Sequence, residues 1–173
     1  MNKAPVRETP RVNHYCTFRL AGHLFGFDIQ AVKEVNTHTT FTNIPRAPPG
    51  VRGYVNLRGN IYLILDLRHL LGMEPAPVTP DSRLLIFKAS VGESFGVLVD
   101  QIGDIATLSP EDIESRRPDD ASRVEETTGA RRAGELVASL GKLDGELLVI
   151  VDAHPLLPMV AQSMEIDRGP GRV

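Results

Sequence analysis

The stretch VRGYVNLRGNIYLILDLRHLLG, residues 51–72, carries the strongest signal for the fold of this chain. Two apolar runs flank Arg58 and Gly59, which is the pattern of a β-hairpin, and RHLLG then fits a short helix that ends at Gly72. Glycine adopts turn conformations that a Cβ atom resists. We therefore predict that the turn aims Arg58 out of the core, with its aliphatic stem packed on apolar neighbours.

Short apolar runs make the rest of the chain rich in strands. Residues 14–29, 83–100 and 135–152 each predict a hairpin, with turns at Ala21-Gly22, Val91-Gly92 and Asp144-Gly145. We expect one helical turn at 31–35, a long exposed loop at 109–134 and a last helical turn at 154–158. The proline-rich stretches 43–50 and 75–81 predict linkers.

Composition limits the classes of function. Of 173 residues, 42% are hydrophobic and 24% are charged, which is typical of a globular domain. The net charge of -3 argues against a protein that binds nucleic acid through its overall charge. The single cysteine excludes an intramolecular disulfide, and no apolar run has the length of a membrane span or the place of a signal peptide. We expect a cytoplasmic bacterial protein.

The chain repeats itself. FRLAGHLFGFDIQAVKEV (18–35) aligns with FKASVGESFGVLVDQIGDI (87–105), and YLILDLRHLL (62–71) aligns with LVIVDAHPLL (148–157). The two signals have the same order in each half, which predicts two similar β-rich subdomains divided near residues 73–82. Each half is too small to bury much apolar area alone, so we expect shared packing and a groove at the junction.

No pattern of residues indicates catalysis or a metal site. The histidines have no paired spacing, and His14-x-Cys16 lacks two further ligands. An aspartate follows an apolar run four times, at Asp28, Asp66, Asp100 and Asp152. Because these aspartates recur in both halves, we expect them to accept backbone N–H groups where strands end, and not to build an active site on Asp66 or Asp152. The sequence predicts no enzyme, no cofactor and no metal.

One motif points to a known family. Pro48, Gly53, Asn56-Leu57-Arg58-Gly59 and Asp66-Leu67-Arg68 together resemble the signature of CheW-like domains, bacterial chemotaxis scaffolds that couple receptors to a CheA histidine kinase. Further weak similarities follow in the same order, and the resemblance covers residues 14–158. It implies an all-β fold of two side-by-side five-stranded barrels, SH3-like or OB-like. We expect subdomains at 14–72 and 83–158, a flexible arm at 1–13 and a tail at 159–173.

The resemblance also implies partners and a binding surface. It makes Glu34 the expected partner of Arg58, at the rim of a groove that accepts the helical tip of a chemoreceptor. The expected receptor-binding residues are Val32, Glu34, Val35, Val55, Arg58, Gly59, Val97 and Val99. The expected contacts with the regulatory domain of the kinase are Arg52 and Gly53.

The predicted function is a non-enzymatic adaptor between chemoreceptors and a CheA-type histidine kinase. We expect neither a nucleic-acid partner nor direct membrane insertion. Two alternatives stay open: an adaptor of a non-flagellar pathway such as pilus motility, and a small β-barrel that binds nucleic acid or another ligand. The structural alternative for Arg58 and Glu34 is a surface salt bridge worth only about 0–1 kcal/mol.

Overall fold

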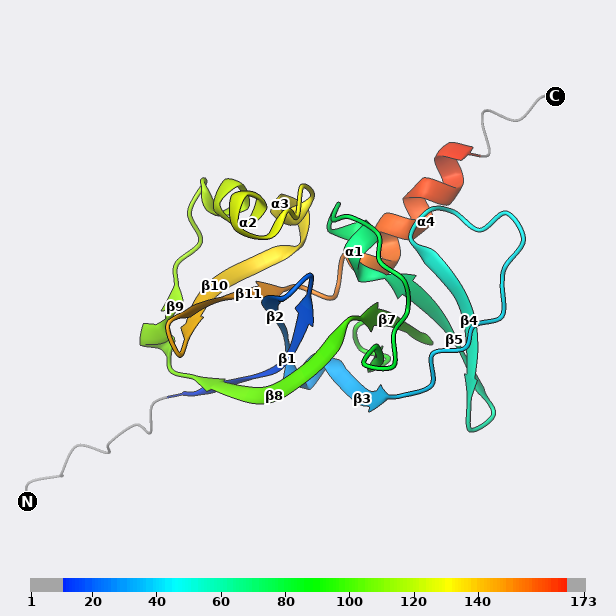
Figure 1. Cartoon of the computed structure of the whole chain (residues 1–173), viewed down its shortest axis with the longest axis horizontal. Coiled ribbons are helices and arrows are strands. Elements are labelled where there is room, and N and C mark those ends of the chain that lie inside the picture. The colour runs from blue at the N-terminus through cyan, green and yellow to red at the C-terminus, as the bar shows by residue number, and fades with distance from the viewer. Residues whose placement is uncertain (1–10, 168–173) are drawn as a thin grey trace, which may run out of the picture.

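The computed structural model describes residues 11–167, which form two small β-barrels lying side by side (Figure 1). Barrel A is a six-stranded sheet in the order β8-β1-β2-β11-β10-β9, and barrel B is a five-stranded sheet in the order β3-β6-β7-β5-β4. The predicted all-β fold with two barrels is confirmed. Barrel A has one strand more than predicted, because a two-residue strand, β9, pairs with β10.

Barrel A takes its strands from both ends of the chain. They are β1 Asn13–Leu20, β2 His23–Asp28, β8 Gln101–Leu108, β9 Ile113–Glu114, β10 Val137–Leu143 and β11 Glu146–Val151. The predicted turn at Ala21-Gly22 has φ angles of 51° and 80°, and the turn at Asp144-Gly145 has 49° and 77°. Two consecutive positive φ angles match the right-handed twist of the flanking strands, so both hairpins close tightly.

Barrel B takes the middle of the chain. Its strands are β3 Val32–Asn36, β4 Val51–Leu57, β5 Asn60–Asp66, β6 Arg83–Phe87 and β7 Phe95–Val99. The helical turn predicted for residues 31–35 is wrong, because only the short η1 Ile29–Ala31 precedes β3, and β3 pairs antiparallel with β6. The β-branched Val32 and Val35 suit that pairing.

The repeat is present, but its two copies exchange strands. In barrel A Phe18 pairs with Ile102, and in barrel B Phe87 pairs with Val32. Since Phe18 aligns with Phe87 and Val32 with Ile102, the two pairs are equivalent, and each joins one copy of the repeat to the other. The parallel pairs β2 with β11 and β7 with β5 are equivalent in the same way.

The exchange corrects the predicted subdomain boundaries. Barrel A combines residues 13–28 with residues 101–151, while barrel B consists of residues 32–99. The division at residues 73–82 separates the two copies of the repeat and does not separate the barrels. The strand β8, which the sequence analysis did not identify as a strand, carries the chain from barrel B back to barrel A along one face of the molecule (Figure 1).

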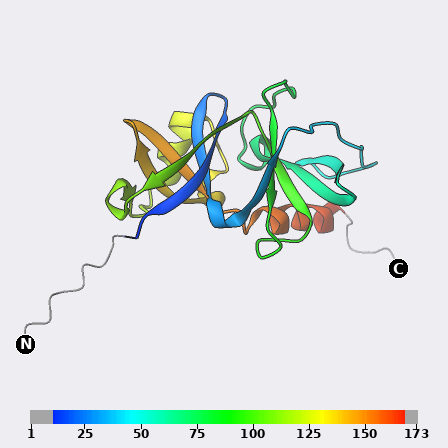
Figure 2. The same ribbon diagram turned by 90° about the horizontal axis from the view of Figure 1, so that it is seen from below.

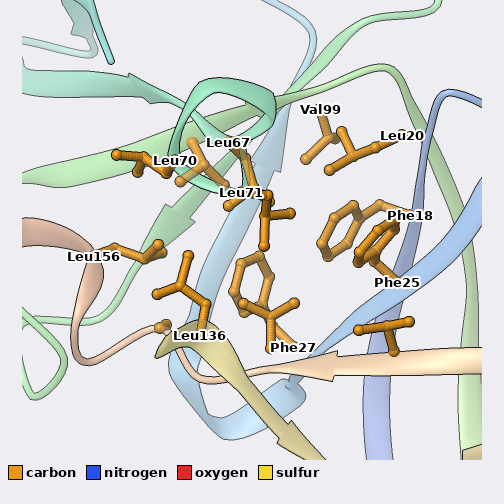
Figure 3. Packing of buried hydrophobic residues seen from close by; sticks show 14 of the residues in the cluster. Phe18, Leu20, Phe25, Phe27, Leu67, Leu70, Leu71, Val99, Leu136 and Leu156 are labelled. Carbon is orange, nitrogen blue, oxygen red and sulfur yellow. The ribbon is translucent and has the colours of Figure 1, made fainter. Parts of the chain in front are cut away.

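One apolar core spans both barrels (Figure 3). Phe18 and Phe27 of barrel A stack with ring centroids 5.0 Å apart, and Phe27 meets Phe87 of barrel B edge to face at 4.9 Å. Such aromatic pairs add about 0.5–1.5 kcal/mol each beyond the area they bury. The expected shared packing is therefore present, and neither barrel has a complete core of its own.

Four helices and one further short turn complete the fold: α1 Leu67–Leu70, η2 Pro110–Asp112, α2 Asp120–Thr128, α3 Ala133–Leu136 and α4 Leu156–Asp167. The exposed loop predicted at 109–134 is wrong, since α2 buries Val124 and α3 buries Ala133 in the shared core. The α1 helix ends as predicted, with Gly72 at φ 72°.

The last helix is longer than predicted. Residues 159–167 continue α4, with Val160 buried, so the predicted tail does not begin at 159. Although α4 follows a strand of barrel A, it lies along barrel B (Figure 2). Residues 1–10 of the predicted arm and 168–173 of the predicted tail lie outside the described residues.

Candidate partner-binding surface

Arg58 occupies the tip of the β4–β5 hairpin. It has φ 53° and Gly59 has φ 84°, so the pair forms the same kind of tight turn as the other two-residue hairpins. The Asn56 side chain supports the turn, because its Oδ1 accepts the backbone N–H of Gly59 at 2.9 Å. The Arg58 side chain is 72% exposed, as the sequence predicts for a residue aimed away from the core.

Glu34 reaches Arg58 from β3, which stands at the opposite end of the strand order from β4. The Arg58 Nη2 atom donates to Glu34 Oε2, and the carboxylate is only 21% exposed. Asn36 Nδ2 also donates to Glu34 Oε1, at 3.4 Å. The pair predicted from the resemblance therefore forms, with a held carboxylate and a guanidinium that keeps most of its surface free for a partner.

The apolar residues of β3 lie on the other face of the strand from Glu34, since Val32 and Val35 pair with Phe87 and Leu85 while Glu34 pairs with Ile86. Val35 is 41% exposed on β3, and Val32 is half-buried against the shared core. Beside them the Lys33 Nζ donates to the Tyr62 hydroxyl at 3.1 Å. An exposed guanidinium held by a carboxylate is a group suited to protein recognition, where Arg is a frequent anchor, and Val35 adds an exposed aliphatic side chain on the other face of β3.

Three predicted contact residues lie elsewhere. Val97 and Val99 are fully buried strand residues of the shared core, and Val55 is buried in a second cluster inside barrel B. A partner cannot touch them without unfolding the strands that hold them. The assignment of these three residues to a contact surface is therefore wrong. Val55 lies on the inward face of β4, where exposed and buried residues alternate, whereas Val97 and Val99 are buried because both faces of β7 are covered.

The two predicted kinase contacts, Arg52 and Gly53, both have close neighbours inside barrel B. The Arg52 Nε atom lies 3.7 Å from Asp66 Oδ2 and has no hydrogen-bond partner among the described residues. Gly53 is buried, and a Cβ atom there would meet the Thr42 carbonyl. The backbone of Thr42 exchanges hydrogen bonds of 2.8 Å and 2.9 Å with Tyr54, which explains the close approach.

The four aspartates at strand ends accept backbone N–H groups, as predicted. Asp28 accepts from Gln30, Asp66 from His69, Asp100 from Ala21 and Asp152 from His154, at 2.8–3.3 Å. Within residues 11–167 no three His, Cys, Asp or Glu side chains gather in a metal-binding arrangement. Among the helices in the same range, none has the length and apolar character needed to span a membrane.

Sequence reasoning missed several exposed apolar side chains, three of which lie on strands. Ile61 and Tyr54 face outward from the β4–β5 hairpin, and Ile105 is 60% exposed on β8. The repeat held a signal for the last of these, because Ile105 aligns with Val35 and pairs with Cys16 as Val35 pairs with Leu85. Strands β3 and β8, which are equivalent in the repeat, thus each carry an exposed aliphatic residue at the same aligned position.

The fold and this surface define a class of protein. Two β-barrels exchange strands, and an exposed arginine at a hairpin tip pairs with a glutamate of β3. The chain belongs to the CheW-like domain family, which it matches over residues 14–161. It is similar to the chemotaxis protein CheW of Rhizobium meliloti (strain 1021), with 33% identity over 142 residues, which cover 82% of this chain and 84% of that protein.

Two further similarities place the chain within the family. The crystal structure of the scaffolding protein TtCheW from Thermoanaerobacter tengcongensis superposes with a TM-score of 0.70 and 29% identity, covering 86% of this chain and 92% of that one. The protein PilI of Pseudomonas aeruginosa is 31% identical over 85 residues, which cover 49% of this chain and 47% of PilI.

Proposed function

We propose that this chain is a non-enzymatic adaptor that couples chemoreceptors to a CheA-type histidine kinase. The observation that supports it most directly is the exposed Arg58 held by Glu34 at the tip of a hairpin, on the surface of a CheW-like fold. An adaptor acts by holding two partners together, which raises their effective concentration. It needs binding surfaces and no reacting group.

The receptor side of the proposal uses strand β3 and the tip of the β4–β5 hairpin. Arg58 offers a planar donor fork to polar groups of the receptor tip, while Val35 and the half-buried Val32 meet its apolar ridge. Gly59 belongs to this surface through the turn that aims Arg58 outward. This proposal places the chain in the cytoplasm, at receptor arrays and attached through its partners.

For the contact with the kinase we propose Arg52 and Gly53 on β4. The Arg52 Nε atom is buried and has only a weak ion pair at 3.7 Å, but the side chain is 29% exposed, and this exposed part would meet a carboxylate or carbonyl of the regulatory domain. Gly53 contributes through the close approach of β4 to Thr42, which shapes the edge that carries Arg52. Neither nucleic acid nor a bilayer takes part in this proposal.

A second candidate is an adaptor of a non-flagellar pathway, favoured by the similarity to PilI. The two candidates share one mechanism and differ in which kinase is bound. Binding to regulatory domains from each chemosensory kinase of the same genome separates them. The third possibility, a nucleic-acid binder, predicts retention on heparin or single-stranded DNA at low salt with a steep loss as salt rises.

The test is a binding assay of the purified chain with the kinase regulatory domain and, separately, with a receptor tip fragment. We expect Arg58→Ala to weaken receptor binding about tenfold, the size of a moderate hot spot, while the melting curve stays cooperative. Lys142→Ala, an exposed change on β10 of the other barrel, serves as control. Unchanged receptor binding would overturn the role of Arg58 in this contact. A melt that loses cooperativity would show that its role is structural.

A further inference from the structure

The two barrels are joined by a polar contact as well as by their core. Arg68 of α1 forms a bidentate ion pair with Asp100, through Nε at 3.0 Å to Oδ1 and through Nη2 to Oδ2. The same Oδ2 accepts the backbone N–H of Ala21 at 2.8 Å. We call Arg68, Asp100 and Ala21 the seam tie.

The seam tie adds a polar link between parts that the shared core already joins. Arg68 lies in α1 directly after β5 of barrel B, and Ala21 lies in the β1–β2 turn of barrel A. Asp100 is the residue between β7 and β8, where the chain crosses. The remaining Nη1 of Arg68 donates to the Glu74 carbonyl at 2.9 Å, in the linker between the two copies of the repeat. The guanidinium of Arg68 thereby joins α1 both to Asp100, where the chain crosses between the barrels, and to the linker.

The members of the tie differ in exposure: Asp100 is 30% exposed and Ala21 is exposed, whereas Arg68 is largely buried. The Arg68 side chain is only 14% exposed, and the hydrogen bond to Asp100 raises the pKa of the guanidinium further above its ordinary value. A planar fork held by two carboxylate oxygens and a carbonyl fixes orientation as well as distance, which a point charge cannot do.

The equivalent position in the other copy of the repeat has no such tie. Arg68 aligns with His154 and Asp100 aligns with Gln30, so a carboxylate is missing there. His154 instead contacts Asp152 in its own segment, with Nδ1 2.9 Å from Oδ1. The pseudo-symmetric junction is therefore held by an ion pair on one side alone, within the described residues.

We propose that Arg68 is a positioning residue: through Asp100 and Ala21 it sets the angle between the barrels, and so the relative placement of the β3 surface with Arg58 and the β8 surface with Ile105. A partner that touches both barrels binds only at that angle. The part of this proposal that concerns partner binding rests on the proposed adaptor function. The part that concerns the angle between the barrels does not depend on that function.

The test measures the angle and the binding separately. Spin labels at Asn60→Cys in barrel B and Lys142→Cys in barrel A report the distance between the barrels, since both positions are exposed. The native Cys16 is buried, and burial raises the pKa of its thiol, so it resists labelling. A mass that corresponds to two labels per chain shows that Cys16 has stayed unlabelled. This mass is measured before any distance.

Three variants enter the comparison. Arg68→Met keeps the stem and removes every donor, and Arg68→Lys keeps the charge and removes the fork. Arg19→Met is the matched control, because Arg19 also forms a bidentate pair, with Glu146 at 2.7 Å and 3.0 Å, but inside barrel A. The same variants without labels are tested for binding to the kinase regulatory domain and to a receptor tip fragment.

We expect Arg68→Met to shift and broaden the distance distribution and to weaken binding of the partner that spans both barrels about tenfold. Arg68→Lys should give a smaller change of the same kind, and Arg19→Met should match the parent in both measurements. An unchanged distance distribution in both Arg68 variants overturns the proposal. A changed distribution with unchanged affinity overturns its link to binding.

Failure of the adaptor function is a different result. If the parent protein binds neither partner, the proposed function fails, while the distance distributions still decide whether Arg68 sets the angle. If Arg68→Met does not fold, Arg68→Lys carries the comparison. If the Arg68→Lys variant melts cooperatively and has the same distance distribution as the parent, this result would count against the proposal.

Discussion

Gly53 is the position where the chain tolerates a side chain least. Its φ is 139°, and a Cβ atom would collide with the Thr42 carbonyl and crowd the Phe41 side chain. Gly59, six residues later, also has a positive φ, but nothing lies within 4 Å of a Cβ atom there. The two glycines of the signature motif therefore have different reasons to be glycine.

A pair of alanine variants separates those reasons. Gly59→Ala should lower the free energy of unfolding by about 1 kcal/mol, the cost of a positive φ alone. Gly53→Ala should lower it by about 2–4 kcal/mol, because the carbonyl contact adds to that cost. Denaturant unfolding measures both. Equal losses would mean that the backbone at Thr42 moves freely to make room.

Individual site residues could be predicted from the sequence where a local turn decides them. The exposure of Arg58 follows from Arg-Gly between two strand runs, since a two-residue turn leaves its first side chain outside. Val97 and Val99 could not be placed in this way. A continuous apolar strand gives no sign of which face a partner could reach, and both faces of β7 are buried.

At the scale of elements, the ion pair between Arg19 and Glu146 joins β1 to the start of β11 across the intervening strand β2. The hydrogen bond from Arg19 lowers the pKa of the Glu146 carboxyl below its ordinary value. A carboxyl with a lowered folded-state pKa stabilises the fold above its unfolded pKa, and this stabilisation is lost as the pH falls through the folded-state pKa.

Comparison of Glu146→Gln with the parent across pH tests this pair. At pH 7 we expect the variant to be less stable by about 0.5 kcal/mol, because the pair is partly exposed and screened. The difference should shrink below the unfolded pKa of about 4.3 and vanish at lower pH. Thermal melts from pH 7 to pH 3 measure it, with Glu126→Gln as an exposed control. A difference that persists in acid would rule out the charge as its origin.

Two elements were mispredicted because long-range contacts overrode the local pattern. Residues 31–35 place Ala31, Val32 and Val35 at helical spacing, yet β6 offers them a strand partner. The helix α2 has one large apolar residue, Val124, so its sequence shows no period. Its burial depends on the small Ala130 and Ala133, which let the segment approach the shared core.

At the scale of the whole molecule, the exchange of strands makes the two barrels one folding unit. Barrel A needs β8 from the second copy of the repeat, and barrel B needs β3 from the first. The core that contains Phe27 and Phe87 belongs to both. A chain built in this way should unfold in one cooperative transition, since neither barrel is complete without the other copy.

Fragments cut in the linker test this interdependence. We expect residues 1–78 and residues 79–173 to be unfolded when alone, and to regain native strand content when mixed. Circular dichroism and a thermal melt of each fragment and of the mixture measure this. A cooperative melt of either fragment alone would mean that each copy of the repeat closes its own barrel, contrary to the observed pairing.

The sequence by itself determined the turns, the hairpins, the register of the repeat and the backbone contacts of the strand-end aspartates, because each of these depends on residues close together in the chain. Tertiary structure alone decided which copy of the repeat each crossing strand joins. Val32 aligns with Ile102 and Phe18 with Phe87, so pairing within a copy and pairing between copies bring together residues of the same kind. Only the closure of both barrels around one core, with Arg68 fixed to Asp100 at the seam, favours the exchanged arrangement.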